Sequence, residues 1–462
     1  MMTVRVIKKR QGRRDPQGAR SVSPARRVAF AVLGRVEDEG AFAALLLAHA
    51  TTDLRVEDRA LCYELVLGTL RWQLWLDSLI AHYAGRVVVE LDAPVRRALR
   101  LGLYQLRFLS RVPASAAVNE SVNLAHAAGL RGAAGFINAV LRRATREPAY
   151  DPAAHIANAL ERLAVSTSHP AWLLARWVSA FGADEAAALA RANNQPPPVA
   201  FRVHERLAES ADVVARLRAA GVAAQASEIA PGAWRVVTGP GGTALRALVQ
   251  DGLVYTQDEA SQLVAHVLGA RAGERILDVC AAPGSKTTHV AGLAEDRALV
   301  VAGDLYEHRL QVVVESAVRQ KLTSIRMVAL DAEQPLPFTD ESFDRVLVDA
   351  PCTGTGTLRH NPEIRWRLKP TDIDDLATRQ QRILANAARA VRPGGRLVYS
   401  TCSVEPEENE GVVNAFLAAQ PDFTAIPVAA PAQLLTATGA VRTWPHRDGA
   451  DGFFVAAFAR QR

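Results

Sequence analysis

The chain has 462 residues, of which 49% are hydrophobic, and its formal net charge at pH 7 is +6. This length suffices for about three domains of roughly 150 residues each, and the hydrophobic content suffices for several cores. No apolar run approaches the ~18 residues that a membrane span requires, and residues 28–33 are too few for the core of a signal peptide. The sequence therefore predicts a cytoplasmic protein without a membrane segment.

The positive charge is concentrated at the start of the chain. Residues 1–27 contain nine lysines and arginines against one acid, Asp15, which is a net charge of +8 and leaves −2 for the rest. Such a basic stretch is either a disordered, solvated tail or an arm that binds the phosphates of a nucleic acid. We expect a disordered tail over residues 1–23, and both interpretations of it remain open.

Residues 24–150 are predicted to form an all-helical domain. Apolar residues recur at helical spacing in five stretches, and short turns rich in glycine or proline separate them. The stretches cover residues 24–49, 56–83, 93–109, 114–129 and 135–146. Three arginines end the last stretch, and they form either an edge that contacts phosphates or a solvated face: Arg142, Arg143 and Arg146.

Residues 151–254 are predicted to hold a helix and a small α+β unit. A linker at residues 147–152 leads to an amphipathic helix at residues 169–181. After the run NNQPPP, the pattern predicts strands at residues 199–204, 223–229 and 234–237 and helices at residues 210–220 and 243–250. The unit is either a platform for RNA or a part that packs against the next domain, and nothing in it suggests chemistry.

Residues 255–462 are predicted to form an α/β domain, because strand and helix signals alternate to the end of the chain. This order predicts an open parallel sheet with helices on both faces, and ligands of such sheets bind at the carboxyl ends of the strands. The predicted strands end at Cys280, Gly303, Leu330, Asp349 and Thr401. Five charged or reactive residues lie at or just beyond such ends and predict a site there: Asp304, Asp331, Asp349, Cys352 and Cys402.

The stretch RILDVCAAPGSK, residues 275–286, is the centre of this prediction. An apolar run indicates a buried strand, a tight turn follows at residues 281–284, and residues 285–293 are predicted to be helical. Small residues and the N–H groups of the helix start allow a ligand to approach closely. Asp304 follows Gly284 by twenty residues, the spacing at which nucleotide-binding folds hold a ribose hydroxyl. The stretch lacks GxGxxG, which argues against a dinucleotide, and a purely structural turn is the alternative.

The four cysteines form no CxxC pair and have no partnered histidines, so that neither zinc nor a disulfide framework is expected and no metal site is predicted. Each cysteine is then either a small buried side chain or a reactive thiol. Cys62, in the middle of a predicted helix, is expected to be buried. Cys352 and Cys402 follow predicted strands, in VLVDAPCTG and LVYSTCS. If these strands are neighbours, both thiols face the pocket formed by residues 281–286.

Two thiols beside a nucleotide-like cofactor suit methylation of carbon 5 of a pyrimidine. A thiolate that adds to carbon 6 makes carbon 5 nucleophilic enough to attack a methyl sulfonium. Asp349 is placed to hold the amino edge and N3 of the ring, and Lys286 to draw charge from its carbonyl side. The base must first be turned out of any stack. Spacing and chemistry leave open which of the two thiols attacks.

The motifs DVCAAPGSKT, DAPCTGTG, YSTCS and RTWPHRDGADGFF resemble those of the Sun/Nop family of RNA cytosine-5 methyltransferases. PASAAVNESVNLAHAA and GFINAVLRR resemble the NusB-like helical RNA-binding module that precedes some rRNA methyltransferases. The whole arrangement after residue 24 is similar to bacterial enzymes that act on small-subunit rRNA. The resemblance implies three folded parts, namely an all-α NusB-like domain at residues 24–150, a small α+β RNA-binding segment within residues 151–254, and a Rossmann-like methyltransferase domain at residues 255–462.

The resemblance also implies S-adenosylmethionine as cofactor and methylation of carbon 5 of a cytosine in 16S rRNA by a monomer. In the family, the cysteine of the TCS motif, here Cys402, is the nucleophile that forms a covalent adduct with carbon 6. The cysteine of the DAPC motif, here Cys352, assists release, and Lys286 and Asp349 complete the expected catalytic residues. The positions that match cofactor-binding residues are Cys280, Ala281, Ala282, Pro283, Gly284, Ser285, Lys286, Asp304 for the ribose, Asp331 for the adenine side, and Asp349. Ser285 and Thr353 replace the Gly and Ser of many members, and both keep a small side chain.

Two other interpretations remain open from the residues alone. A non-catalytic RNA-binding or ribosome-assembly factor with this fold would be expected to have lost at least one of the two cysteines, and both are present. A methyltransferase that acts on amino groups needs no thiol and would leave Cys402 unexplained. The segment RHNPEIRWRLK, residues 359–369, either contacts RNA beside the target base or begins a surface helix.

Overall fold

The computed structural model describes residues 22–239 and 241–462. The described residues form two compact units, one that ends at Ala154 and one that begins at His155. All but the last two residues of the basic tail predicted at residues 1–23 lie outside the described residues. In the described part of the chain, no helix is long and apolar enough to cross a membrane.

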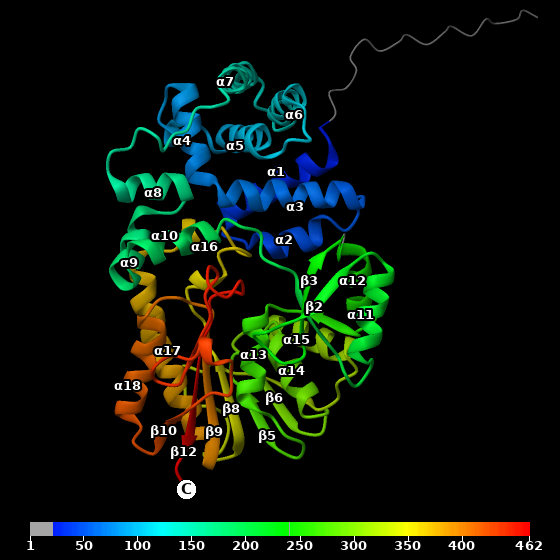
Figure 1. The fold of residues 1–462 in the computed structure, drawn as a ribbon, viewed down its shortest axis with the longest axis vertical. Coiled ribbons are helices and arrows are strands. Elements are labelled where there is room, and N and C mark those ends of the chain that lie inside the picture. Colours follow the sequence, from blue (N-terminus) through cyan, green and yellow to red (C-terminus); the bar gives the residue numbers. More distant parts are fainter. Residues whose placement is uncertain (1–21, 240) are drawn as a thin grey trace, which may run out of the picture. The chain divides into compact units, whose positions relative to one another are not determined.

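The first unit is built from helices, which confirms the all-α prediction (Figure 1). The elements are α1 (Pro24–Glu39), α2 (Ala43–Ala50), α3 (Val56–Arg71), α4 (Gln73–Ala84), η1 (Val88–Glu90), α5 (Ala93–Phe108), α6 (Ala114–Ala127), η2 (Arg131–Ala133) and α7 (Ala134–Arg146). Residues 24–49 form two helices, because Gly40 ends α1 with a φ of +68°, a left-handed conformation that glycine adopts readily. Residues 56–83 also form two helices, α3 and α4, which meet at Trp72.

The apolar faces of these helices make one core. Cys62 is fully buried in it, and burial raises the pKa of this thiol to about 11, so the prediction of a buried, unreactive side chain is confirmed. Arg143 on α7 is committed to its own unit, since its guanidinium donates to Glu147 Oε1 and to the carbonyl oxygen of His82, both at 3.1 Å. Arg143 therefore contributes to the structure of its own unit, while Arg142 and Arg146 are exposed.

The second unit begins with three helices and a small antiparallel sheet. The sheet has the order β2-β3-β1-β4, and two helices accompany it. These elements are α8 (Ala159–Thr167), α9 (Ala171–Phe181), α10 (Ala183–Ala192), β1 (Ala200–Val203), α11 (Ser210–Ala219), β2 (Ala223–Ala226), β3 (Ala233–Thr238), α12 (Gly241–Gln250) and β4 (Val254–Thr256). The α+β character predicted for this segment is confirmed, and its edge strand β4 spans the predicted boundary between residues 254 and 255.

The rest of the second unit is organised around an eight-stranded sheet of order β10-β12-β9-β8-β5-β6-β7, with β11 paired to β12. The strands are β5 (Arg275–Asp278), β6 (Leu299–Asp304), β7 (Ile325–Ala329), β8 (Phe343–Asp349), β9 (Val391–Thr401), β10 (Phe423–Ile426), β11 (Val441–Arg442) and β12 (Phe454–Arg460). Strands β5 to β9 pair in parallel, as predicted. The prediction of a wholly parallel sheet is wrong, because β12 pairs antiparallel with both β9 and β10. Residues 427–453, all of them described, contain no long helix that could carry the chain across the sheet, and a parallel pair requires such a crossover.

Helices cover both faces of this sheet (Figure 1). Successive residues of a buried strand point to opposite faces, so Ile276 packs with one set of helices and Leu277 with the other. The first set is α13 (Glu259–Leu268), α14 (Ser285–Leu293) and α15 (Glu307–Arg319), and the second is α17 (Pro370–Ala390) and α18 (Val412–Ala419). The remaining short turns are η3 (Thr355–Thr357), α16 (Ile364–Arg367), η4 (Glu407–Gly411) and η5 (Ala432–Leu434). The carboxyl ends of the parallel strands are thereby left between the two helical layers.

Candidate active site

A cavity of about 320 Å³ lies at the carboxyl ends of the parallel strands. Its wall includes residues that directly follow β5, β6, β7, β8 and β9. Seven of the residues singled out from the sequence line it: Cys280, Ala282, Asp304, Asp331, Asp349, Cys352 and Cys402. The other members of the predicted set lie in the turn after β5 and at the start of α14, and are not among the lining residues: Ala281, Pro283, Gly284, Ser285 and Lys286.

The turn after β5 brings the backbone close to the cavity. Gly284 has a φ of +101°, and a Cβ atom there would lie 3.1 Å from the Cα of Val313 on α15, so a side chain is excluded at this position. The N–H of Ala281 donates to the carbonyl oxygen of Gly303 at 2.8 Å, which joins the turn to the end of β6. The peptide bond between Ala282 and Pro283 is cis.

Asp304 closes β6 and faces this turn. One carboxylate oxygen accepts the N–H of Ala282 at 3.2 Å, and the other accepts the N–H of Tyr306 at 3.2 Å. The guanidinium of Arg309 lies 3.3 Å from Asp304. The carboxylate is thus fixed by backbone donors at the wall of the cavity, where the sequence places a ribose contact.

Asp278 is a buried acid that the sequence analysis did not single out. It is the last residue of β5, and the hydroxyl of Thr287 donates to it at 2.7 Å. Burial raises the pKa of Asp278 to about 7, and the nearby charge of Asp349 adds to the increase, whereas the Thr287 hydrogen bond opposes it. Burial and the nearby carboxylates also raise the pKa of the Cys280 thiol. An acid within an otherwise apolar strand was the signal that could have revealed this residue.

Asp349 ends β8 and pairs with Lys286 of α14. The Lys286 Nζ lies 2.7 Å from one carboxylate oxygen, and the Ser400 hydroxyl donates to the other at 2.8 Å. Burial alone would lower the pKa of Lys286, but the Asp349 charge outweighs it and the pKa is raised, so the ammonium keeps its proton. The Nζ atom lies 5.1 Å from the centre of the Phe453 ring.

Cys352 and Cys402 meet at one edge of the cavity. They follow β8 and β9, which are adjacent and parallel, with Asp349 opposite Ser400 in the register. The two Sγ atoms are 3.3 Å apart. The hydrogen bond to Cys402, together with burial, raises the pKa of Cys352 well above its ordinary value. Cys352 therefore stays protonated and can donate its S–H to the Cys402 sulfur.

In the segment of residues 359–369, two of the basic side chains are buried, whereas Lys369 is exposed at the start of α17. Arg365 is fully buried and donates to Asn194 Oδ1 at 2.9 Å and to the carbonyl oxygen of Ser168 at 3.2 Å. Arg359 is also buried and donates to Asp451 at 3.2 Å. These two arginines neither contact RNA nor belong to a surface helix, because both are used to bind other segments of the same unit.

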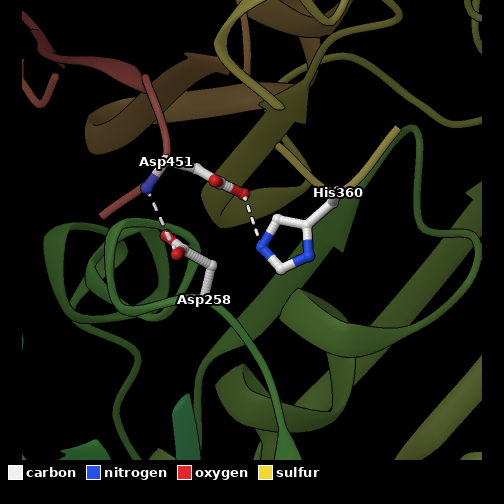
Figure 2. Close-up of side chains that lie close together, drawn as sticks. All are labelled: Asp258, His360 and Asp451. Atoms are coloured by element: carbon white, nitrogen blue, oxygen red, sulfur yellow. Dashed lines mark hydrogen bonds and ion pairs between the residues drawn. The ribbon is translucent and has the colours of Figure 1, made fainter. Parts of the chain in front are cut away.

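His360 lies close to Asp451 and Asp258 in a partly buried cluster (Figure 2). Arg359 also pairs with Asp451. The backbone N–H of Asp451 donates to Asp258 at 3.2 Å, and the Asp451 carboxylate lies 3.3 Å from His360 Nε2. Burial raises the pKa of Asp451 to about 6, and burial with the Asp451 charge raises that of Asp258 to about 7. The three acid and imidazole groups lie within 4.8 Å of one another, but Arg359 already supplies a positive charge. We therefore interpret the cluster as an ion pair that joins three segments, rather than as a metal site.

Four further polar or charged residues that the sequence did not reveal line the cavity: Tyr306, Arg309, Glu333 and Arg379. Arg379 and Arg382 on α17 both pair with Glu333, which follows β7. Their only signal in the sequence is a position shortly after a predicted strand end or on a helix. Because exposed arginines and glutamates are common, that signal is too weak to single them out.

Comparison with known proteins agrees with this architecture. The family described as 16S rRNA methyltransferase RsmB/F matches residues 265–459, the NusB family matches residues 23–146, and the ferredoxin-like domain of RsmF/B-like methyltransferases matches residues 169–239. Over 446 residues the chain is 35% identical to the probable ribosomal RNA small subunit methyltransferase B of Bacillus subtilis, a match that covers 94% of this chain and 98% of that protein. The chain belongs to the RsmB/F family of rRNA methyltransferases.

Other members of this family and solved structures extend the comparison. The ribosomal RNA small subunit methyltransferase B of Pseudomonas putida is 37% identical over 401 residues, which cover 86% of this chain and 90% of that protein. The crystal structure of PH0851 matches 96% of this chain and 99% of its own with a TM-score of 0.82 and 28% identity. A methyltransferase homolog from Pyrococcus horikoshii matches 66% of this chain and all of its own with a TM-score of 0.59 and 27% identity. The predicted order of a NusB-like, a small α+β and a Rossmann-like methyltransferase domain is thereby confirmed, as is rRNA methylation.

Proposed function

We propose that this rRNA methyltransferase transfers a methyl group from S-adenosylmethionine to carbon 5 of a cytosine in 16S rRNA, through a covalent bond between Cys402 and carbon 6. The observation that carries the proposal is the pair of thiols, 3.3 Å apart, beyond the ends of adjacent strands. Both line the cavity that also holds Asp349. Methylation of an amino group or a ribose needs no thiol, whereas methylation of a pyrimidine carbon does.

The residues around the cavity fit S-adenosylmethionine. The cavity has a volume of about 320 Å³, which lies within the range of small-molecule sites, roughly 300–1,000 Å³. The carboxylate of Asp304 suits the hydroxyls of a ribose, and that of Asp331, on the same wall, suits the amino side of an adenine. Residues 280–285 and Asp349 would surround the remainder. When bound, the cofactor supplies an electrophilic methyl group on a sulfonium.

The first step assigned to the protein is activation of the base. Carbon 5 of cytosine is a weak nucleophile, and the Cys402 sulfur raises its electron density by forming a bond to carbon 6. The negative charge that develops on the ring is stabilised by Lys286, whose raised pKa keeps it charged. Asp349, held by Lys286 and Ser400, presents an acceptor to the amino edge of the ring, and to N3 once N3 takes up a proton during the attack. The base must leave its stack to reach this position.

The second step is release of the product. Once carbon 5 carries the methyl group, a water molecule or another base takes up its hydrogen as a proton. The C–H electron pair then forms the double bond between carbons 5 and 6, the bond between Cys402 and carbon 6 breaks, and its electron pair returns to sulfur. A thiolate leaves more readily when a donor stabilises it. Cys352 keeps its proton and lies 3.3 Å from the Cys402 sulfur, which supports a role for Cys352 in this step.

Small-subunit rRNA is the proposed partner of the whole chain. We assign RNA binding to residues 24–150 and 151–254 and chemistry to residues 255–462, with the basic residues 1–23 adding contacts to phosphates. The NusB family match and the ferredoxin-like match support two separate domains in front of the catalytic one. Both then serve to bring one cytosine to the cavity.

The test of the proposal is a map of 5-methylcytosine in 16S rRNA. The rRNA of cells that contain the protein is compared with that of cells that lack it, and a transcript of 16S rRNA is treated with purified protein and S-adenosylmethionine. We expect one cytosine to lose its methyl group in the deficient cells and the same cytosine to gain it in the purified reaction. Methylation at a nitrogen or a ribose, or of no 16S nucleotide, would contradict the proposal.

A further inference from the structure

One turn of the chain, η4, carries two neighbouring side chains that are both fully buried, Glu408 and Asn409. The turn is π-helical, since the N–H of Gly411 donates to the carbonyl oxygen of Pro406, five residues earlier, at 2.9 Å. Such widened turns recur at functional sites. Neither side chain was singled out from the sequence. Both bind residues that flank the two cysteines.

Glu408 holds the loop that carries Cys352. Its carboxylate accepts the backbone N–H of Thr353 at 2.9 Å and the hydroxyl of the same residue at 2.5 Å. It also accepts the hydroxyl of Ser403 and the amide of Gln380, the latter at 2.9 Å. Four donors thus converge on two oxygens, a set that only an acceptor without hydrogens can satisfy.

Gln380, on α17, also binds the loop that carries Cys352. Its amide nitrogen donates to the carbonyl oxygen of Pro351 at 2.9 Å as well as to Glu408. Both partners of this nitrogen are oxygens that only accept, which fixes the orientation of the amide. The residue before Cys352 is therefore held by Gln380, and the residue after Cys352 is held by Glu408.

Asn409 holds the loop that carries Cys402 in the same manner. Its amide oxygen accepts the hydroxyl of Thr401 at 2.5 Å, and its amide nitrogen donates to the carbonyl oxygen of Ser403 at 2.9 Å. A carbonyl oxygen can only accept, so the orientation of this amide is determined by its partners. The residues before and after Cys402 are both held by one side chain.

We propose that Glu408 is a positioning residue for Cys352 and Asn409 a positioning residue for Cys402, so that each supports a different step of the reaction. Loss of the Glu408 carboxylate removes the acceptor for the backbone N–H of Thr353, while the backbone of Ser403 remains bound to Asn409. The Cys352 loop is thus affected more than the Cys402 loop. This inference rests on the proposed function, in which Cys402 attacks and Cys352 assists release.

The experiment separates the two steps by the choice of RNA. A 16S rRNA transcript made with cytidine requires attack, methyl transfer and release for turnover. A transcript made with 5-fluorocytidine carries fluorine in place of the hydrogen that must leave as a proton. Fluorine cannot leave as a cation, so the covalent adduct persists, and its rate of formation reports attack and methyl transfer alone. The adduct is counted on a denaturing gel for both transcripts.

Three variants on the same turn are compared with the wild type. Glu408→Met, which leaves no acceptor for the Thr353 N–H, should trap the fluorinated RNA within twofold of the wild-type rate, turn over ordinary RNA at least tenfold more slowly, and accumulate the adduct on ordinary RNA. Asn409→Asp, which loses the donor to Ser403, should trap the fluorinated RNA at least tenfold more slowly and accumulate nothing. Glu410→Gln is the matched control, because Glu410 pairs with Arg442 at 2.6 Å, and it should match the wild type in both assays.

The ratio of the two rates distinguishes positioning from loss of structure. A variant that is merely less folded loses both rates by the same factor, so equal losses in Glu408→Met would overturn the proposal. Wild-type behaviour of Glu408→Met, or normal trapping by Asn409→Asp, would also overturn it. If Glu408→Met does not fold, Gln380→Leu removes the hydrogen bond to Pro351 and should show the same slow release with normal trapping. Equal losses of both rates in Gln380→Leu would also overturn the proposal. A wild-type protein that neither methylates nor traps the transcript would instead refute the proposed function.

Discussion

Thiols occur in two regions of this molecule, the core of the helical unit and the strand ends of the methyltransferase domain. Cys62 is fully buried in the apolar core of the helical unit, and burial alone raises its pKa to about 11. Cys352 and Cys402 are only partly buried, face one another at 3.3 Å, and share a cavity with Asp349. The difference lies in the polar partners that adjacent strand ends bring together. Burial in an apolar core keeps the Cys62 thiol unreactive. The polar neighbours of Cys402, namely the Cys352 thiol and the pair of Asp349 and Lys286, are those that a reactive thiol requires.

The largest effect is expected from a substitution of the reactive cysteine, Cys402. Cys402→Ala should abolish methyl transfer, because no thiolate then reaches carbon 6. Cys62→Ala, its matched control, should leave the rate unchanged and lower the free energy of unfolding by about 1 kcal/mol, as small buried substitutions do. Transfer of labelled methyl groups to 16S rRNA and thermal melting measure the two effects. Activity of Cys402→Ala within a few-fold of wild type would show that Cys402 is not the nucleophile.

A smaller effect is expected at the cofactor side of the cavity. Asp304→Ala should weaken binding of S-adenosylmethionine by on the order of 1–3 kcal/mol, because the substitution removes both the proposed ribose acceptor and the acceptor for the Ala282 N–H. Asp304→Asn, which keeps one acceptor, should weaken binding less. Titration calorimetry measures both. Equal affinity of Asp304→Ala and wild type would make Asp304 a structural residue only.

The buried cluster of Asp258 and Asp451 predicts a pH dependence of stability. The pKa of Asp258 is raised to about 7 in the folded protein from an ordinary value near 3.8, so the folded state gains stability from this group at low pH and loses it as the pH rises toward 7. Asparagine cannot ionise and escapes this loss. Between pH 5 and pH 8, the free energy of unfolding of Asp258→Asn should therefore rise relative to that of wild type by roughly 2–3 kcal/mol. If the melting temperatures of Asp258→Asn and wild type changed in parallel from pH 5 to pH 8, the raised pKa of Asp258 would be contradicted.

The smallest expected effect concerns the basic residues at the start of the chain. Deletion of residues 1–23 removes seven of the nine lysines and arginines of residues 1–27. RNA binding should weaken, and the plot of log affinity against log salt concentration should become less steep by about 0.7 for each phosphate that the shortened chain no longer neutralises. Filter binding at several salt concentrations measures this slope. The same slope with and without the deletion would leave the segment as an inert tail.

Much of the catalytic domain could be predicted because its signals are local. A buried parallel strand is a short apolar run, and a glycine-containing turn before a helix follows it, so β5, the turn at residues 281–284 and α14 could be predicted from the sequence. The rule that ligands bind at strand ends then placed Asp304 and the two cysteines together, and the structure brings them to one cavity.

The features that could not be predicted depend on residues that are distant from one another in the sequence. Arg365 is buried because Asn194, 171 residues away, accepts its hydrogen bond, and no local pattern distinguishes it from an exposed arginine. The link between Glu408 and the Cys352 loop depends on a hydrogen bond from Thr353, which is 55 residues away in the sequence. The antiparallel strand β12, which lies between β9 and β10, was not predicted, because the pairing of a strand is decided by the strands beside it. Interactions of this kind become visible only when the chain is folded.

The most direct test of the mechanism compares three variants for a covalent complex with RNA: Cys352→Ala, Cys402→Ala and the double variant. Each is incubated with a 16S rRNA transcript and S-adenosylmethionine and run on a denaturing gel. Cys352→Ala should give a slower band, because attack and methyl transfer proceed while release stalls, and mass spectrometry should place the RNA on Cys402. Neither of the other two should give a band. A band from Cys402→Ala and none from Cys352→Ala would reverse the two roles, and full activity without a band in both single variants would contradict the covalent mechanism.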